Sequence, residues 1–377
     1  MRANGEGAFN TFMRIAILGT RGIPANYGGF ETFAQELSTR LVQRGHDVTV
    51  YCRRANYPEP LAEYQGVRLI TLPTIHTKSL DTLSHAFLSS LHVLLQRIDI
   101  ALYCNSATSC FAWIPRLRRA QVVMNPDGTE WERAKWGWAG KTFYKCSEHL
   151  AARIAHRIVS DSNVIREYYR EKFGCDSDFV AYGADLIERG TGRELLSEFG
   201  VRPEGYFLFV SRLEPENNAH LVVKAFENVK TDINLVVVGS APFADDYIRR
   251  LTDTKDRRVI FPGALYGEPY RALRANAYVY VNAMEVGGTH PAILEAMGAG
   301  NCVLVSDIAY NAEAVAEAGV QFKSKDVDDC REKMQWLVDH PEQVREFRKQ
   351  AVERVRTQYN WDDVVSAYED VFKSLFD

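Results

Sequence analysis

The sequence predicts an α/β protein built from two Rossmann-like domains that face each other across a cleft. Its 377 residues exceed the roughly 250 to 300 at which a single hydrophobic core stops growing. Short apolar runs rich in Val, Ile and Tyr alternate with helical patterns, which is typical of parallel sheets covered by helices. The alternation pauses once, in a Gly-containing charged stretch at 183–205, and then restarts.

The N-terminal half predicts one complete domain. Its first strand is RIAIL at 14–18, followed by a glycine-rich loop and then by a helix that ends near Gly45. The apolar face of that helix carries Phe30, Phe33, Ala34, Leu37 and Leu41. Further strands are expected at 47–52, 67–72, 99–104, 121–124, 157–160 and 178–182. We therefore expect one domain over 13–185, preceded by an extension at 1–12.

The second half predicts another domain of the same kind over 186–358. Its strands are expected at 206–211, 233–239, 258–263, 277–282 and 302–306. The pattern after residue 326 is helical throughout, and the last helix, 361–376, carries an apolar stripe that needs a surface to cover it. We expect this C-terminal segment, 359–377, to return to the N-terminal domain.

Composition excludes several classes of protein. The seven cysteines are scattered, without C-x-x-C pairs or histidines at metal-ligand spacing, so we expect buried reduced thiols and no metal. No run approaches the roughly 20 apolar residues that cross a bilayer, and the N-terminus lacks a signal-peptide pattern. A net charge of −4, without a nucleic-acid module, argues against nucleic acid as a partner. The half 1–185 is basic, which favours an anionic partner, although ordinary scatter also explains it.

The loop after the first strand contains Gly19, Gly22, Gly28 and Gly29. Glycines at a strand-to-helix turn let backbone N–H groups approach a phosphate or sugar, and the helix N terminus adds positive charge. The loop is not the G-x-G-x-x-G fingerprint of dinucleotide sites. A ligand-binding loop and a purely structural turn both fit.

Arg212 lies in SRLEPENN (211–218), directly after the first strand of the second half. Open α/β sheets bind ligands at this edge, and a guanidinium there can hold a diphosphate through two hydrogen bonds. The alternative is an arginine paired with Glu214 or Glu216.

The segment AMEVGGTHPAILEAMGAG (283–300) is the most specific of the chain. Gly287, Gly288 and Thr289 precede a helix that opens at Pro291, and this arrangement predicts an anion site made of backbone amides. One turn inside the helix, Glu295 can accept hydrogen bonds from both hydroxyls of a ribose. His290 fits a helix cap or a packed residue as well as a catalytic one.

Two further segments belong to the first half. In MNPDGTEW (124–131), Asp127 follows a strand in a Pro/Gly turn, where it can meet a reacting hydroxyl or close its own turn. In WERAKWGWAGKTFYK (131–145), basic residues alternate with aromatic ones, as at a membrane interface or a polyprenyl-phosphate site. CFAWIPRLRR (110–119) has the same character. Core packing under a loop is the alternative.

Together these segments resemble the retaining glycosyltransferases of family 4, from about Met13 to the C-terminus. The resemblance implies the GT-B architecture and a reaction that needs no metal. Arg212 matches the arginine of the family motif G-R-L-x-x-E-K, which binds the donor diphosphate. Glu295 matches the second glutamate of its Glu-x7-Glu motif, which binds the ribose. VAYGAD (180–185) resembles the family hinge, and YNWDDVV (359–365) resembles the start of the returning helix.

The sequence departs from the family at two positions. Asn217 stands where the motif has lysine, and Gly287 stands where it has the first glutamate, with Glu285 as a substitute two residues earlier. The combination is similar to bacterial rhamnosyltransferases that build capsule and cell-wall polysaccharides from dTDP-rhamnose. Because the basic aromatic segments suit a membrane interface, we also expect a lipid-linked acceptor and a cytoplasmic protein at the inner face of the membrane. The resemblance implies three sets of site residues. The catalytic set is Asp127, Arg212 and Glu285, and the acceptor-binding set is Glu31, Asp127, Glu130 and Trp131. The donor-binding set is Gly28, Gly29, Arg212, Asn217, Gly287, Gly288, Thr289, His290 and Glu295.

Two other functions remain open. Arg53 and Arg54 follow the second strand, where an NADP-dependent oxidoreductase would hold the 2′-phosphate of its cofactor. The replaced lysine and the shifted glutamate also fit a sugar-nucleotide-binding protein without activity.

Overall fold

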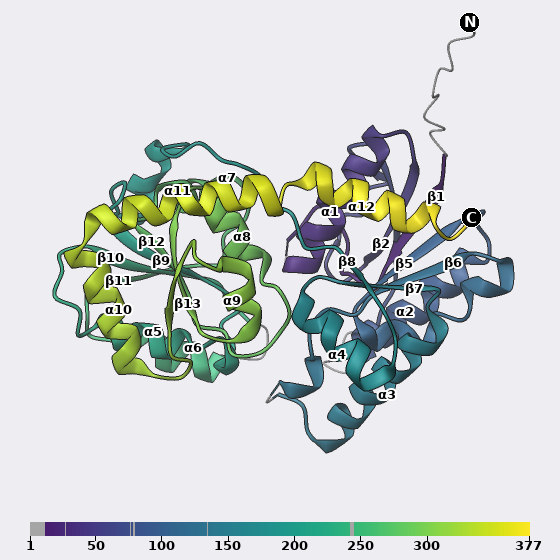
Figure 1. Cartoon of the computed structure of the whole chain (residues 1–377), viewed down its shortest axis with the longest axis horizontal. Helices are drawn as coiled ribbons and strands as arrows, with labels where there is room; N and C mark the ends of the chain where they lie inside the picture. Colours follow the sequence, from purple (N-terminus) through teal and green to yellow (C-terminus); the bar gives the residue numbers. More distant parts are fainter. Residues whose placement is uncertain (1–11, 27, 76, 78–79, 134, 242–244) are drawn as a thin grey trace, which may run out of the picture.

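The computed structural model describes residues 12–377 except 27, 76, 78–79, 134 and 242–244, so most of the expected extension at 1–12 lies outside it. The described residues form two sheets (Figure 1). The first sheet has the order β3-β4-β2-β1-β5-β6-β7-β8, and the second has the order β11-β10-β9-β12-β13-β14. All neighbouring strands run parallel except the β3–β4 pair. The predicted α/β class with two Rossmann-like domains is confirmed.

Helices cover both faces of the first sheet. Its strands are β1 (Arg14–Leu18), β2 (Asp47–Arg53), β3 (Glu63–Tyr64), β4 (Val67–Leu72), β5 (Ile100–Cys104), β6 (Gln121–Asn125), β7 (Arg157–Ser160) and β8 (Asp178–Phe179). Its helices are α1 (Gly29–Gln43), α2 (Leu80–Val93), α3 (Trp138–Ile154) and α4 (Asn163–Phe173), with short 3-10 helices at Ser106–Phe111, Pro115–Arg118 and Glu130–Glu132.

The second sheet is built in the same way. Its strands are β9 (Tyr206–Val210), β10 (Asn234–Val238), β11 (Val259–Gly263), β12 (Val279–Asn282), β13 (Cys302–Ser306) and β14 (Val320–Phe322). The helices that follow the linker are α5 (Ala219–Phe226), α6 (Asp245–Thr252), α7 (Gly267–Asn276), α8 (Pro291–Gly298), α9 (Ala309–Val315), α10 (Val327–Asp339), α11 (Pro341–Gln358) and α12 (Trp361–Lys373). Further 3-10 helices lie at Arg193–Phe199 and Pro215–Asn217.

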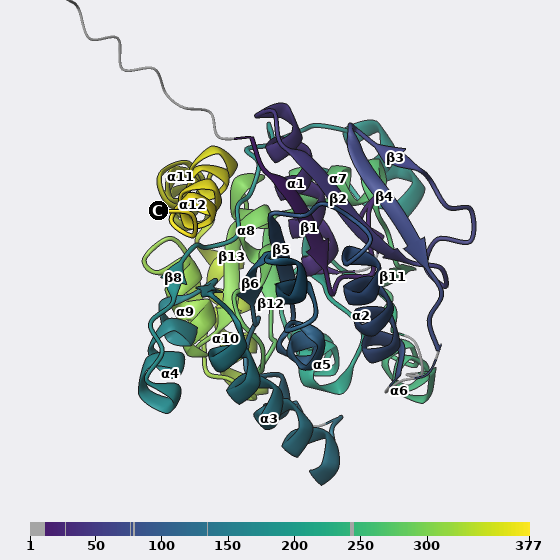
Figure 2. The ribbon, with the colours of Figure 1, turned by 90° about the vertical axis from the view of Figure 1, so that its right-hand side faces the viewer.

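The last two helices join the domains along one edge of the molecule. Figure 1 shows α11 and α12 end to end across both domains, and Figure 2 views the pair nearly along its axis. On α12, the Tyr368 ring lies 5.5 Å from that of Phe33 in α1, and Glu369 pairs with Arg44 at 3.0 Å. The expected return of the C-terminal helix to the N-terminal domain is confirmed.

The linker passes directly under this helix. A Cβ on Gly183 would lie 2.5 Å from the indole of Trp361, and the Ala184 amide donates to the Tyr359 carbonyl at 2.7 Å. Only glycine allows this approach. The same contact explains why β8 ends at Phe179 instead of residue 182: the chain leaves the sheet there to pack against α12.

Two short strands escaped sequence prediction. β3 is two residues long and largely exposed, so it has no apolar alternation. β14 has three residues and lies at the edge of the second sheet. The cysteines are free, and four of them, Cys52, Cys104, Cys302 and Cys330, are buried. Within the described ranges, no helix is long and apolar enough to cross a membrane.

Candidate active site

Two helix N termini, one from each domain, meet between the sheets. Gly28 caps α1 after the central strand β1, and α8 begins at Pro291 after β12. A Cβ on Gly29 would lie 3.0 Å from Pro291 Cγ. Both β1 and the central strand β9 lie where the strand order of their sheet reverses, which is where α/β proteins bind ligands. The partial positive charges of the two helices therefore converge at one place.

The loops beside these helices touch backbone to backbone. A Cβ on Gly128 would lie 2.2 Å from both Gly287 C and Gly288 N. No side-chain movement relieves such an overlap, so this approach of the two domains requires glycine at position 128. Gly287 has a φ of +140°, which favours glycine for a second reason.

Asp127 stands in this contact with its carboxylate turned toward Gly288. Its φ is +65°, and its amide donates to Asn125 Oδ1 at 3.1 Å. The turn is thus closed by the side chain of Asn125, and not by Asp127 itself. Burial, followed by the charge of Glu130, raises the pKa of Asp127 to about 6, against the opposing charges of Arg133 and Arg212.

Arg212 extends toward the first domain from the end of β9. Its charge acts on Asp127 and Glu130 across the contact and on His290 within its own domain. Its Nη1 also lies 3.9 Å from Glu214 Oε2, so the local ion pair that was the alternative interpretation is present but long. Asn217, at the position of the family lysine, is buried and donates from Nδ2 to the Arg212 carbonyl at 2.6 Å.

His290 and Glu285 have different surroundings from those of Asp127. His290 occupies the N-cap position of α8 without a side-chain capping bond. Burial, then Arg133 and Arg212, lower its pKa to about 3, so the ring is neutral at physiological pH. Glu285 Oε2 pairs with Lys325 Nζ at 2.7 Å. The substitute glutamate is therefore held by a cation of its own domain.

Glu295 lies on α8 and has two partners on α7. Tyr270 donates to Glu295 Oε2 at 2.9 Å, and the Arg274 guanidinium contacts the same oxygen. These partners were not predicted from the sequence. Their spacing of four residues on one helix face is the signal that was available.

Three of the expected acceptor residues, Glu31, Glu130 and Trp131, form hydrogen bonds or ion pairs with neighbouring protein groups. Glu31 is 5% exposed and accepts from the Arg21 amide at 2.8 Å. Glu130 binds Arg133, Lys135 and the Trp136 indole. Trp131 donates to the Tyr168 hydroxyl at 3.2 Å, under Lys145 Nζ, which lies 4.3 Å from its ring.

The basic aromatic segment 131–145 is partly packed and partly exposed: Arg133 and Tyr144 are buried, whereas Glu132, Trp138 and Lys145 are exposed. Trp136 packs on Tyr144 with the ring centroids 5.2 Å apart, whereas Trp138 is 83% exposed at the start of α3. The two interpretations given above apply to different residues of the segment. Trp131 and Trp136 are half-buried and contact neighbouring aromatic residues, whereas Trp138 is exposed.

Asp161, which no sequence motif singled out, joins the two domains directly. Its Oδ2 accepts from the Thr289 amide at 2.9 Å, and its carbonyl accepts from the Thr289 hydroxyl at 3.1 Å. The signal in the sequence was its place directly after a strand, which it shares with Asp127. It was missed because no matched motif includes it.

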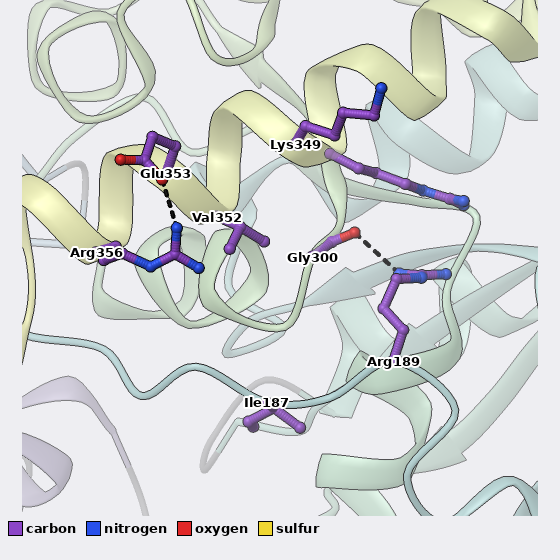
Figure 3. Close-up of a pocket in the computed structure, with 8 residues that line it drawn as sticks. Ile187, Arg189, Gly300, Lys349, Val352, Glu353 and Arg356 are labelled. Atoms are coloured by element: carbon purple, nitrogen blue, oxygen red, sulfur yellow. Dashed lines mark hydrogen bonds and ion pairs between the residues drawn. The ribbon is translucent and has the colours of Figure 1, made fainter.

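Two other features lie apart from this contact. Arg53 is 4% exposed and pairs with Asp81 at 2.6 Å, so the structure does not favour the oxidoreductase alternative, which needs this arginine at a cofactor phosphate. A cavity of about 560 Å³ (Figure 3) lies between the linker and α11. No residue that the sequence assigned to the site lines it. Within the described residues, no group of three His, Cys, Asp or Glu side chains is placed to hold a metal ion.

Comparisons with known protein families divide the chain as its two sheets do. Residues 12–185 match a domain of unknown function, DUF1972, and residues 204–340 match the glycosyl transferases group 1. An uncharacterized glycosyltransferase of Methanocaldococcus jannaschii is 20% identical over 69% of this chain and 70% of its own length. The D-rhamnosyltransferase WbpZ of Pseudomonas aeruginosa is 27% identical, over 57% of this chain and 59% of its own.

Solved structures resemble the whole chain. HepE of Anabaena, in complex with UDP and glucose, superimposes with a TM-score of 0.79 over 96% of this chain and 100% of its own, at 16% identity. Sucrose-phosphate synthase of Thermosynechococcus elongatus gives 0.80 over 97% of this chain and 99% of its own, at 17% identity. At this identity the likeness shows the fold.

Proposed function

This chain is a glycosyltransferase of the GT-B fold, with a group 1 domain at 204–340, and we propose the reaction that it catalyses. It transfers L-rhamnose from dTDP-rhamnose, with retention, to a lipid-linked saccharide. The observation that carries the proposal is the meeting of the α1 and α8 N termini beside Arg212 and Asp127. Backbone amides, helix dipoles and a guanidinium suit a nucleoside diphosphate.

The donor lies on the second domain in this proposal. Arg212 and the amides of Gly287 and Gly288 hold the diphosphate and stabilise the charge that it gains as the glycosidic bond breaks. Glu295 receives the ribose hydroxyls. Both of its described contacts use Oε2, and the ribose is assigned to the other oxygen.

The acceptor lies on the first domain, with its hydroxyl beside Asp127. The bond from the anomeric carbon to the donor phosphate breaks, and the acceptor oxygen bonds to that carbon on the same face. The acceptor proton passes to the leaving phosphate, so no protein nucleophile takes part. Asp127 orients the hydroxyl and stabilises the positive charge of the opened sugar. Its pKa of about 6 leaves the carboxylate charged at neutral pH.

A panel of nucleotides and sugar donors tests this assignment. Calorimetry with dTDP, UDP and GDP should give the tightest binding for dTDP, and transfer from dTDP-rhamnose to a polyprenyl-linked saccharide should exceed transfer from UDP-glucose. The anomeric configuration of the product, read by NMR, should equal that of the donor. Binding of dTDP without any transfer or donor hydrolysis would instead identify a silent binding protein.

The membrane partner is assigned to an exposed apolar face of the first domain. On α2 and in the turn after it, Phe87, Leu91 and Leu95 stand four residues apart and are 41%, 39% and 76% exposed. Beside them, Trp113 and Leu117 are 48% and 65% exposed, and the Phe111 ring lies 5.3 Å from that of Phe87. The adjacent segment carries Arg116, Arg118 and Arg119. Apolar side chains with a cationic rim suit the anionic inner face of a membrane.

Liposome sedimentation tests the membrane assignment. Each Arg near an anionic surface contributes about 1 kcal/mol, so replacing Arg116, Arg118 and Arg119 with Gln should lower the partition coefficient roughly 100-fold. The matched control replaces three arginines of the second domain, Arg249, Arg250 and Arg257, and should sediment as the wild type does. Equal sedimentation of both variants on anionic vesicles would exclude this face.

A further inference from the structure

Two acidic residues occupy matching places on neighbouring strands of the first sheet. β6 and β7 run parallel, with Val123 opposite Arg157. Asp127 follows the end of β6, and Asp161 follows the end of β7. Because the carboxyl ends of parallel strands meet at one edge, the two residues are brought together there.

Both carboxyl groups approach the same residue of the other domain. The position that a Cβ would take on Gly288 lies 2.8 Å from Asp161 Oδ2 and 3.3 Å from Asp127 Oδ1. Asp161 is 2% exposed, and its Oδ1 has no hydrogen-bond partner among the described residues. Its Oδ2 and its carbonyl hold the amide and hydroxyl of Thr289.

The charges around the pair come from a further carboxylate on one side and from two arginines on the other. Glu313 of α9 faces Asp161 and adds a third carboxylate, while Arg133 and Arg212 act on Asp127. The other titratable groups that face Asp161 are the hydroxyls of Tyr182, Tyr310 and Tyr368. Two like charges that both lie against one buried residue cannot both stay ionised without a large cost.

We propose that Asp161 is the positioning residue of the donor loop: it draws Gly287–Thr289 onto Asp127 when the domains close, and the two carboxyl groups then hold one proton between them. This role rests on the proposed function, because it assigns the loop to the donor. The proton resides on Asp161, which leaves Asp127 charged toward the acceptor. Closure therefore takes up a proton that the separated domains do not carry.

The direction of the pH dependence follows from the two states. In the closed form, burial first and Asp127 second raise the pKa of Asp161 to about 8, against the hydrogen bond from Thr289. With the domains apart, a solvated aspartate has a pKa of about 3.9. A pKa raised by closure means that closure weakens as pH rises from about 4 to 8, by up to tenfold per pH unit, and levels off above.

Small-angle scattering of the full chain measures closure without any nucleotide. The radius of gyration of the wild type should increase between pH 6 and pH 9. Asp161→Asn keeps an acceptor for Thr289 but has no charge, so its radius should stay at the closed value over this range. Asp161→Ala loses the acceptor and should be more open at every pH. Asp232→Asn, at an exposed position of the second domain, should follow the wild type.

Kinetics separate positioning from a structural role. Asp161→Asn should keep wild-type kcat/KM for the donor at pH 6 and exceed it at pH 8.5, whereas Asp161→Ala should lose roughly 10- to 100-fold at both. Identical pH profiles of scattering and of kcat/KM in the wild type and Asp161→Asn would overturn the proposal. So would equal losses in Asn and Ala that follow only their melting temperatures. Scattering needs no donor, so it still tests the role of Asp161 in closure if the glycosyltransferase assignment fails.

Discussion

Asp127 is held in a left-handed turn by the side chain of Asn125, so its own carboxylate is not used to close the turn. An Asx-turn formed by Asp127 itself would have used that carboxylate on the backbone. Instead, Asn125 accepts the Asp127 amide through its side chain. The burial that accompanies this arrangement moves the pKa of Asp127 into the range where enzymes operate.

Replacing Asp127 with Asn should therefore cost activity with little loss of stability. We expect kcat/KM to fall roughly 10²- to 10⁴-fold while dTDP affinity is kept. In the wild type, kcat/KM should drop as pH falls below about 6, because Asp127 gains a proton there, and this acid limb should vanish in the variant. Asp176→Asn, exposed in the same domain, is the control. An Asp127→Asn protein that is stable and fully active would contradict the assignment.

Glu295 has both a ribose role in the proposal and an observed role as the partner of Arg274. Glu295→Gln keeps the acceptor for Tyr270 but loses the charge. Losing hydrogen bonds to a charged group costs about 1.5 to 3 kcal/mol, so dTDP affinity should fall roughly 10- to 100-fold in calorimetry. Tyr270→Phe removes a partner and keeps the carboxylate, so it should retain more affinity than Glu295→Gln. Unchanged dTDP binding by Glu295→Gln would remove the ribose assignment.

At the scale of elements, α12 supports the turn that carries Asp127. Asn125 donates from Nδ2 to the buried Tyr368 hydroxyl at 3.1 Å, and its other side-chain atom holds the Asp127 amide. The final helix of the chain thus fixes the orientation of an amide in the first domain. Sequence showed that this helix returns, because its apolar stripe required a cover, but the hydroxyl contact depends on tertiary packing.

Tyr368→Phe leaves the Asn125 amide without its partner. An unsatisfied buried donor costs about 1 to 3 kcal/mol, so thermal unfolding should occur at a lower temperature. Acceptor turnover should fall beyond what stability explains, whereas dTDP affinity should stay. Tyr278→Phe is the matched control, because its hydroxyl donates to the Leu337 carbonyl at 2.7 Å within the second domain. If both variants lose turnover equally, α12 has no special link to Asp127.

Which residues the sequence could nominate as candidates follows from the kind of signal that each carries. Arg212, Asp127 and Glu295 stand after strands or inside the first turns of a helix, and such places are readable from periodicity. The contacts of Asp161 with Thr289 and of Glu285 with Lys325 join segments far apart in the chain. Spacing along a sequence does not encode these pairs, so only the fold reveals them.

At the scale of the whole molecule, the two domains meet most tightly at Gly128. Gly128→Ala places a methyl group 2.2 Å from backbone atoms of Gly287 and Gly288, so the domains must separate. We expect a larger radius of gyration and a fall in turnover of about 100-fold, since a displacement of 1 Å can cost that much. Binding of dTDP to the second domain should change little.

Gly137→Ala is the control for this variant. It lies in the same connection, and a Cβ there meets nothing within 4 Å. The control should keep wild-type turnover and radius of gyration. Full turnover in Gly128→Ala would mean that catalysis does not need this contact.

The return of α12 has a consequence for replacing the second domain by that of a relative. Both the first strand and the last helix belong to one domain, so the other is inserted into it and is joined at two places, the linker beyond Phe179 and the junction of α11 with α12. A chimera that takes the inserted domain from a relative must therefore fit the first domain at both connections. The contact between Trp361 and Gly183 packs the two connections against each other. Recombination at both connections therefore preserves this contact, whereas a single crossover pairs a linker and an α12 from different proteins.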